Sequence, residues 1–237
     1  MNYIKESLLL GIFICAGLAI LGLSIGNSII KIKGMERTVT VKGLSEREVK
    51  ADIAIWPIKF TNAANDLSEL YGLVEQNSSQ VVSFLKENGF KGHEISISSP
   101  SIIDKQAQGY SNYDKIKFRY TASTLITLYT NEVDKVRGTM GKILDLGKDG
   151  IVLSGNEYDS RPEFLYTKLN DIKPAMIEEA TKKAREVAVK FAKDSQSKLG
   201  KIKRASQGLF TIKNRDKNTP YMKKVRVVTT IEYYLSD

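Results

Sequence analysis

A long alanine-striped segment from Asp171 to Gly200 constrains the fold of this chain more than any other stretch. Its apolar and small residues recur at three- and four-residue spacing, which predicts one amphipathic helix. Pro174 near the start and Gly200 just past the end both suit helix boundaries. A row of small side chains lets a neighbouring backbone approach closely along one face: Ala180, Ala184, Ala188 and Ala192. We therefore predict a helix that packs on a sheet and carries no chemistry.

The N-terminal part of the chain has no charged residue from Ser7 to Ile30. Leu8 to Ile25 is almost wholly apolar, and about 18 helical residues rise roughly 27 Å, near the thickness of a hydrocarbon core. We predict an uncleaved membrane anchor over residues 1–30 and a linker over residues 31–37. The alternative is a cleaved signal peptide, because Ser24 and Gly26 are small residues at suitable spacing. The predicted span includes Leu8, Ile12, Leu18, Leu23 and Ile25.

Two opposing signals bear on the orientation of this anchor. Lys31, Lys33 and Arg37 come after the apolar run, and these charges by themselves favour a cytoplasmic location for the C-terminal domain. A short tail directly before an apolar run normally acts as an export signal, however, and long domains translocate largely regardless of charge. We predict a single-pass inner-membrane protein whose domain faces the periplasm. The alternative is a protein released into the periplasm after signal cleavage.

The rest of the chain mixes strand and helix patterns. Long strands follow one another without intervening helices, which favours an α+β fold with mainly antiparallel sheet packed by helices. We predict one domain over residues 38–237. Besides the alanine-striped helix, the patterns predict helices over 66–88 and 131–147. They predict strands over 38–42, 51–60, 95–103, 117–130, 151–158, 163–169, 201–212 and 225–235.

Four short segments resemble the SIMPL-domain family in their order and spacing. They are Val41-Lys42-Gly43 with Ala51-Asp52, Leu85 to Gly89 followed by Glu94-Ile95, Tyr120-Thr121-Ala122-Ser123, and Lys198-Leu199-Gly200-Lys201-Ile202. The resemblance covers roughly residues 37–237. It implies an exported bacterial α+β protein with a signal sequence or anchor, related to channel-like ring assemblies of the periplasm or outer membrane and to envelope stress. It supplies no shared catalytic residue. Trp56-Pro57 and the basic C-terminal third depart from the family pattern.

No residue pattern indicates an enzyme. His93 is the single histidine and has no evident nucleophile or orienting partner nearby in sequence, and Cys15 lies inside the apolar run. Four carboxylates could gather around calcium, but their spacing fits no EF-hand loop: Asp145, Asp149, Glu157 and Asp159. We predict no catalytic residue, no metal and no cofactor. The alternative is an envelope hydrolase or another enzyme with an unrecognised site.

The basic balance of the chain, a formal net charge of +9, is concentrated near the C-terminus. Between Lys198 and Arg226 the sequence contains a single acidic residue, Asp216. This region predicts attraction to an anionic membrane surface or an acidic envelope partner, whereas nucleic acid is not expected. The alternative is a solvated face that keeps the protein soluble. We expect a membrane-anchored protein that acts by binding or by self-assembly as a homo-oligomer. The predicted anionic-surface contact comprises Lys201, Lys203, Arg204, Lys213, Arg215, Lys217, Lys223 and Lys224.

Overall fold

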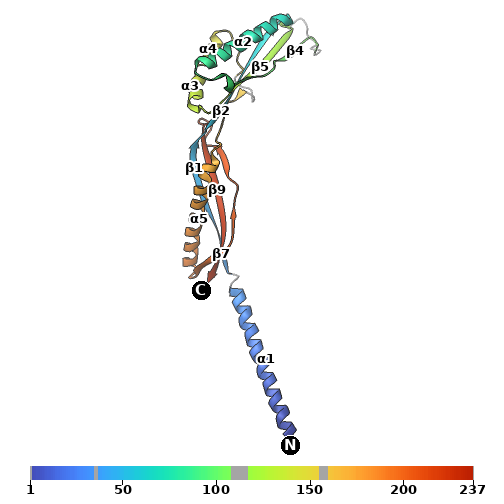
Figure 1. Ribbon diagram of the computed structural model, residues 1–237, viewed down its shortest axis with the longest axis vertical. Coiled ribbons are helices and arrows are strands. Elements are labelled where there is room, and N and C mark those ends of the chain that lie inside the picture. Colours follow the sequence, from blue (N-terminus) through green and yellow to red (C-terminus); the bar gives the residue numbers. More distant parts are fainter. Residues whose placement is uncertain (1, 35–36, 108–116, 155–159, 237) are drawn as a thin grey trace. The chain divides into compact units, whose positions relative to one another are not determined.

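The computed structural model describes residues 2–34, 37–107, 117–154 and 160–236 (Figure 1). It has an α+β fold with antiparallel sheet and an N-terminal apolar helix, which confirms the predicted fold class. The chain forms two compact units, each assembled from segments distant in sequence. The first unit comprises Met1–Arg47, Asn170–Thr211 and Arg226–Asp237; the second comprises Glu48–Leu169 and Ile212–Val225. The single domain predicted over residues 38–237 thus contains parts of both units.

The N-terminal helix α1 extends over Asn2–Gly34. Within it, Gly11–Ile30 is long and apolar enough to cross a membrane, by length and composition alone. Of the residues predicted to lie in the span, Leu8 lies in α1, and four others expose their side chains: Ile12, Leu18, Leu23 and Ile25. Residues 31–34 are helical, so the helix continues into the segment that we predicted as linker.

The first unit packs one helix on a sheet in which the strands have the order β1-β9-β7. These strands are β1 (Thr38–Lys50), β9 (Met222–Ser236) and β7 (Lys198–Gln207), and the helix is α5 (Leu169–Asp194). All four alanines of the predicted stripe are buried. Ala184 and Ala188 pack with Val41 of β1 and with Ile231 and Tyr233 of β9. The sequence prediction of an alanine-striped packing helix is therefore confirmed.

The end of α5 corrects the predicted boundary. Gly200 lies in β7, and a Cβ there would come within 2.9 Å of the Tyr234 carbonyl oxygen. The helix ends at Asp194, and Gln196, two residues later, adopts a φ of 53°. Backbone hydrogen bonds from Gln196 to Lys193 and from Ser197 to Ala192 close the last turn in the Schellman pattern. A non-glycine residue thus supplies the left-handed cap.

Replacing Ala184 by leucine tests the packing of this stripe. Ala184 is fully buried, so the larger side chain should overpack the contact and lower the free energy of unfolding by about 1–3 kcal/mol. Lys182→Leu, on the exposed face of α5, should change it by less than about 0.5 kcal/mol. Thermal unfolding of the full chain in detergent, followed by circular dichroism, measures both. Identical melting of the two variants would contradict the placement of α5.

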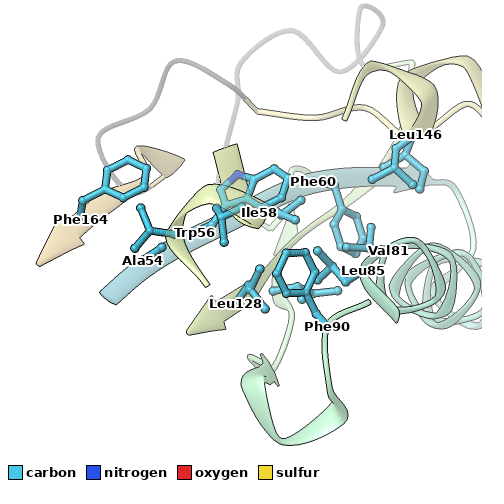
Figure 2. Packing of buried hydrophobic residues seen from close by; sticks show 14 of the residues in the cluster. Ala54, Trp56, Ile58, Phe60, Val81, Leu85, Phe90, Leu128, Leu146 and Phe164 are labelled. Carbon is cyan, nitrogen blue, oxygen red and sulfur yellow. The ribbon is translucent and has the colours of Figure 1, made fainter. Parts of the chain in front are cut away.

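The second unit contains a five-stranded sheet with the order β3-β5-β2-β6, and β4 also pairs with β5. Its strands are β2 (Ile53–Ala64), β3 (Ile95–Ile97), β4 (Ser101–Asp104), β5 (Tyr120–Thr130) and β6 (Glu163–Leu165). Its helices are α2 (Leu67–Glu87), η1 (Gly92–Glu94), α3 (Val133–Met140) and α4 (Leu144–Lys148). Figure 2 shows the core, in which the alternate β2 residues Trp56, Ile58 and Phe60 belong to one cluster with Val81 and Leu85 of α2, and Phe60 lies beside Val81.

Several predicted strands are shorter or divided. The strand predicted over 95–103 is interrupted at Pro100, whose missing N–H cannot join a ladder, and forms β3 and β4. The strand predicted over 201–212 splits into β7 and β8 (Thr211–Asn214), and β8 pairs with β9. Of the strand predicted over 151–158, the described part makes one bridge, between Leu153 and Phe60. The helix predicted from Asp66 is confirmed, because Asp66 caps α2 by accepting from the backbone of Ser68 and Glu69.

Candidate functional site

The basic residues predicted to contact an anionic surface are divided between the two units. Lys201, Lys203 and Arg204 lie on β7 in the first unit. The others lie in the second unit, in or near the segment that joins β8 to β9: Lys213, Arg215, Lys217, Lys223 and Lys224. The predicted contact is therefore two separate basic groups, one in each unit.

On β7, acidic residues from other strands neutralise part of the basic group. Lys203 forms an ion pair with Glu232 of β9 at 3.1 Å, and its ammonium also lies over the Tyr234 ring. Hydrogen bonds from Thr38 and then from Lys203 lower the pKa of Glu232. Arg226 similarly pairs with Glu46 at 3.6 Å. These partners lie outside the stretch from Lys198 to Arg226, so carboxylates other than Asp216 also neutralise part of its charge.

In the second unit, Arg215 belongs to a turn that is held together by side-chain hydrogen bonds. Asp216 accepts hydrogen bonds from the backbone of Asn218 and Thr219, and Arg215 donates to Asp216 at 3.0 Å. The Thr219 hydroxyl and the Arg215 guanidinium hold the pKa of Asp216 at about 2. Arg215 also pairs with Glu48 at 3.5 Å. The charge of Arg215 is therefore largely committed to the fold of this turn.

Lys223 corrects the predicted surface, because it is not at the surface. The residue is 7% exposed, and its ammonium donates to the side chain of Asn214. Burial lowers the pKa of Lys223, against the opposing influence of Glu163. The exposed lysines of this group that make no ion pair with a described residue are Lys213 and Lys217. These two remain the strongest candidates for contact with an anionic partner.

His93 lies where the sequence suggested, in the short helix η1 just before β3, and it is exposed. Its neighbour Glu94 accepts from the Thr130 hydroxyl and from the Lys91 backbone. Burial raises the pKa of Glu94, but these hydrogen bonds outweigh it and leave the pKa below its ordinary value. Glu94 therefore stays ionised in a capping role and does not have the raised pKa of a general acid.

The carboxylates considered for calcium do not form a site among the described residues. No group of three or more metal-ligating side chains occurs there. Asp145 pairs with Lys148 at 2.7 Å, while Glu157 and Asp159 lie outside the described residues.

A polar groove along α2 in the second unit was not predicted from the sequence. Two adjoining hollows, of about 620 and 530 Å³, share Gln76, Gln80 and Asp149 in their walls. The first hollow lies between α2 and the region of α4, and the second reaches the end of β2 at Thr61, Asn62 and Ala63. Their size is typical of ligand clefts.

Two buried acceptors of this groove have no hydrogen-bond partner among the described residues. They are Oδ1 of Asn62 and Oε1 of Gln80. An unpaired buried acceptor costs about 1–3 kcal/mol, so such atoms call for an explanation. Spacing in the sequence gives no sign of this site, because Asn62, Gln80 and Asp149 come from three separate elements.

Comparison with known proteins places these features in a family. A family model described as "SIMPL: Protein of unknown function (DUF541)" matches residues 39–232. The matched residues include both basic groups and the polar groove. No curated protein gives a significant match.

Proposed function

We propose that this chain, which belongs to the SIMPL family, is a membrane-anchored protein of the bacterial cell envelope that acts by binding an anionic partner. The apolar segment Gly11–Ile30 supports the anchor. Exposed cations that no described carboxylate neutralises support the partner, and in the basic group of the second unit these are Lys213 and Lys217. In the proposed topology the domain faces the periplasm, so an anionic lipid surface or an acidic envelope protein lies within reach.

The β7 edge of the first unit's sheet favours binding of an anionic partner over self-assembly through this strand. Among the described strands, β7 pairs with β9 alone, so its second edge is open. Open edges invite pairing with another chain, but lysines along an edge oppose pairing with a like strand. Lys201 and Lys203 stand on β7. Two copies meeting at this edge would therefore bring like charges together.

Vesicle capture tests the anionic partner. The full chain is reconstituted in phosphatidylcholine liposomes, and capture of fluorescent vesicles with or without phosphatidylglycerol is measured. Capture should require phosphatidylglycerol and should fail in 1 M salt, where the Debye length falls to about 3 Å. Each cation near an anionic surface contributes about 1 kcal/mol, so joint Lys213→Glu and Lys217→Glu should reduce capture at least about tenfold.

A matched charge reversal on α5 provides the control. Lys182→Glu with Lys190→Glu changes the net charge equally at exposed positions of another element and should leave capture within about twofold of the unmodified chain. Arg215 is left unchanged because it holds its turn together. Capture that is independent of lipid charge and salt, or that falls equally with both pairs of substitutions, would contradict the anionic partner. The basic residues would then serve only to keep the protein soluble.

A further inference from the structure

The outer edge of β2 is vacant at its C-terminal end. On the side away from β5, β6 pairs with residues Ile53–Ile55, and the Thr61 N–H donates to the Val152 carbonyl at 3.1 Å. Alternate residues of a strand direct their backbone groups to the same side, so the N–H and C=O of Ala63 face the same way as the Thr61 N–H. No described strand pairs with Ala63 on this side.

A turn at Gly150 explains why the edge is vacant. Gly150 has a φ of 89°, a left-handed conformation that suits glycine. The Ile151 N–H donates to the Leu146 carbonyl at 3.1 Å, which ties this segment to α4. The chain therefore turns at Gly150 and, in its described part, runs beside β2 from Val152 to Ser154, which leaves Ala63 beside the polar groove.

The opposite wall of the groove presents side-chain amides. Leu73, Gln76, Asn77 and Gln80 of α2 line the hollow that reaches Ala63. Asn62 is 7% exposed. Its Oδ1 and the Oε1 of Gln80 are both buried and accept no hydrogen bond from a described residue. Hydrogen-bond donors are therefore what these two amide oxygens lack. A backbone that pairs with the β2 edge carries such donors at regular spacing.

The far end of the groove is acidic. Glu87, Asp145 and Asp149 line it together with Lys142. Asp145 is already paired with Lys148 at 2.7 Å, and Lys142 donates to the Asn88 side chain at 3.0 Å. Glu87 and Asp149 are the carboxylates of this end that pair with no cation among the described residues. A basic side chain therefore suits this end.

We propose that the groove binds an extended polypeptide segment of another protein, added as a strand to the β2 edge at Ala63, with a basic side chain toward Asp149. Backbone hydrogen bonds to Ala63 supply affinity, and the amides of α2 and the acidic end supply selectivity. A glycan would leave the strand edge unpaired. The groove is independent of the anionic partner proposed above, because none of the lysines that would contact that partner lines it.

Ala63→Pro removes the one backbone donor that the proposal requires. Pro57 already occupies an outward-facing position of β2, so the strand tolerates proline in this register. Ala63→Val keeps the N–H and is the matched control. The probe is a pool of random-sequence blocked peptides that each contain arginine, and fluorescence anisotropy measures its binding to the full chain in detergent. Binding to Ala63→Pro should be at least about tenfold weaker, and binding to Ala63→Val within about twofold.

Two further measurements complete the test. Hydrogen exchange of residues 61–64 should slow when peptide is added to the unmodified chain, and a pool with glutamate in place of arginine should bind more weakly. Equal binding by a correctly folded Ala63→Pro variant overturns the proposal. So does failure of the unmodified chain to bind the peptide pool, or protection of residues 61–64 by chito-oligosaccharides and not by peptides.

Discussion

Gly43→Ala is expected to abolish stable packing of the first unit. A Cβ at this position would lie 1.8 Å from the Ala180 carbonyl oxygen and 2.6 Å from the Ala184 nitrogen. An α-helix joins these two atoms in one of its own hydrogen bonds, so the methyl group would collide with the α5 backbone and no rotamer change could relieve it. Either α5 leaves the sheet or its hydrogen bond breaks. We expect a loss of at least about 4 kcal/mol, a large part of a domain's total stability.

Circular dichroism and fluorescence of the full chain in detergent measure this effect. Loss of α5 should lower the helical signal, while Trp56, the single tryptophan, reports on the core of the second unit. Gly72→Ala is the matched control, because a Cβ at that helical position meets nothing within 4 Å. It should stabilise α2 by up to about 1 kcal/mol. Wild-type melting of Gly43→Ala would show that α5 does not approach β1 this closely.

The contact at Gly43 also shows what the sequence could reveal. The alanine row predicted that another backbone approaches α5 closely, because small side chains at every fourth position leave room for it along one face of a helix. The sequence does not say which backbone approaches, because Gly43 and Ala180 are brought together by the sheet order β1-β9-β7. The end of α5 was missed for a related reason: Gln196 takes a conformation for which glycine is the usual signal.

The candidate sites were predictable to different degrees. The basic residues were visible as composition, but their ion pairs with Glu46, Glu48 and Glu232 join residues distant in sequence. The burial of Lys223 likewise depends on its place in β9, where alternate residues face inward. No local sequence pattern predicted the groove, because its walls come from β2, α2 and the region of α4. The pairing of the strands and the turn at Gly150 bring these elements together. Periodicity describes single elements, whereas sites form where several elements meet.

Arginines in the middle of α1 are expected to remove the protein from the membrane. Leu18 and Leu21 are exposed apolar residues within the span Gly11–Ile30. An arginine at the centre of a membrane helix costs about 2.5–3.5 kcal/mol on insertion scales, so Leu18→Arg with Leu21→Arg should prevent insertion. Fractionation after alkaline extraction should find the unmodified chain in membranes and the double variant absent from them. Ser28→Arg, near the end of the span, should remain inserted because its side chain reaches the interface.

The N-terminus of the mature protein then separates an anchor from a signal peptide. An uncleaved anchor predicts an intact mass that begins at or near Met1 and a domain that added protease digests after the outer envelope is opened. Both expectations rest on an apolar run longer than the usual signal-peptide core, which is about 7–15 residues. A mature chain beginning at Asn27 would contradict the anchor and indicate a protein released into the periplasm. Protection from protease after the outer envelope is opened would place the domain in the cytoplasm and remove the predicted contact with envelope partners.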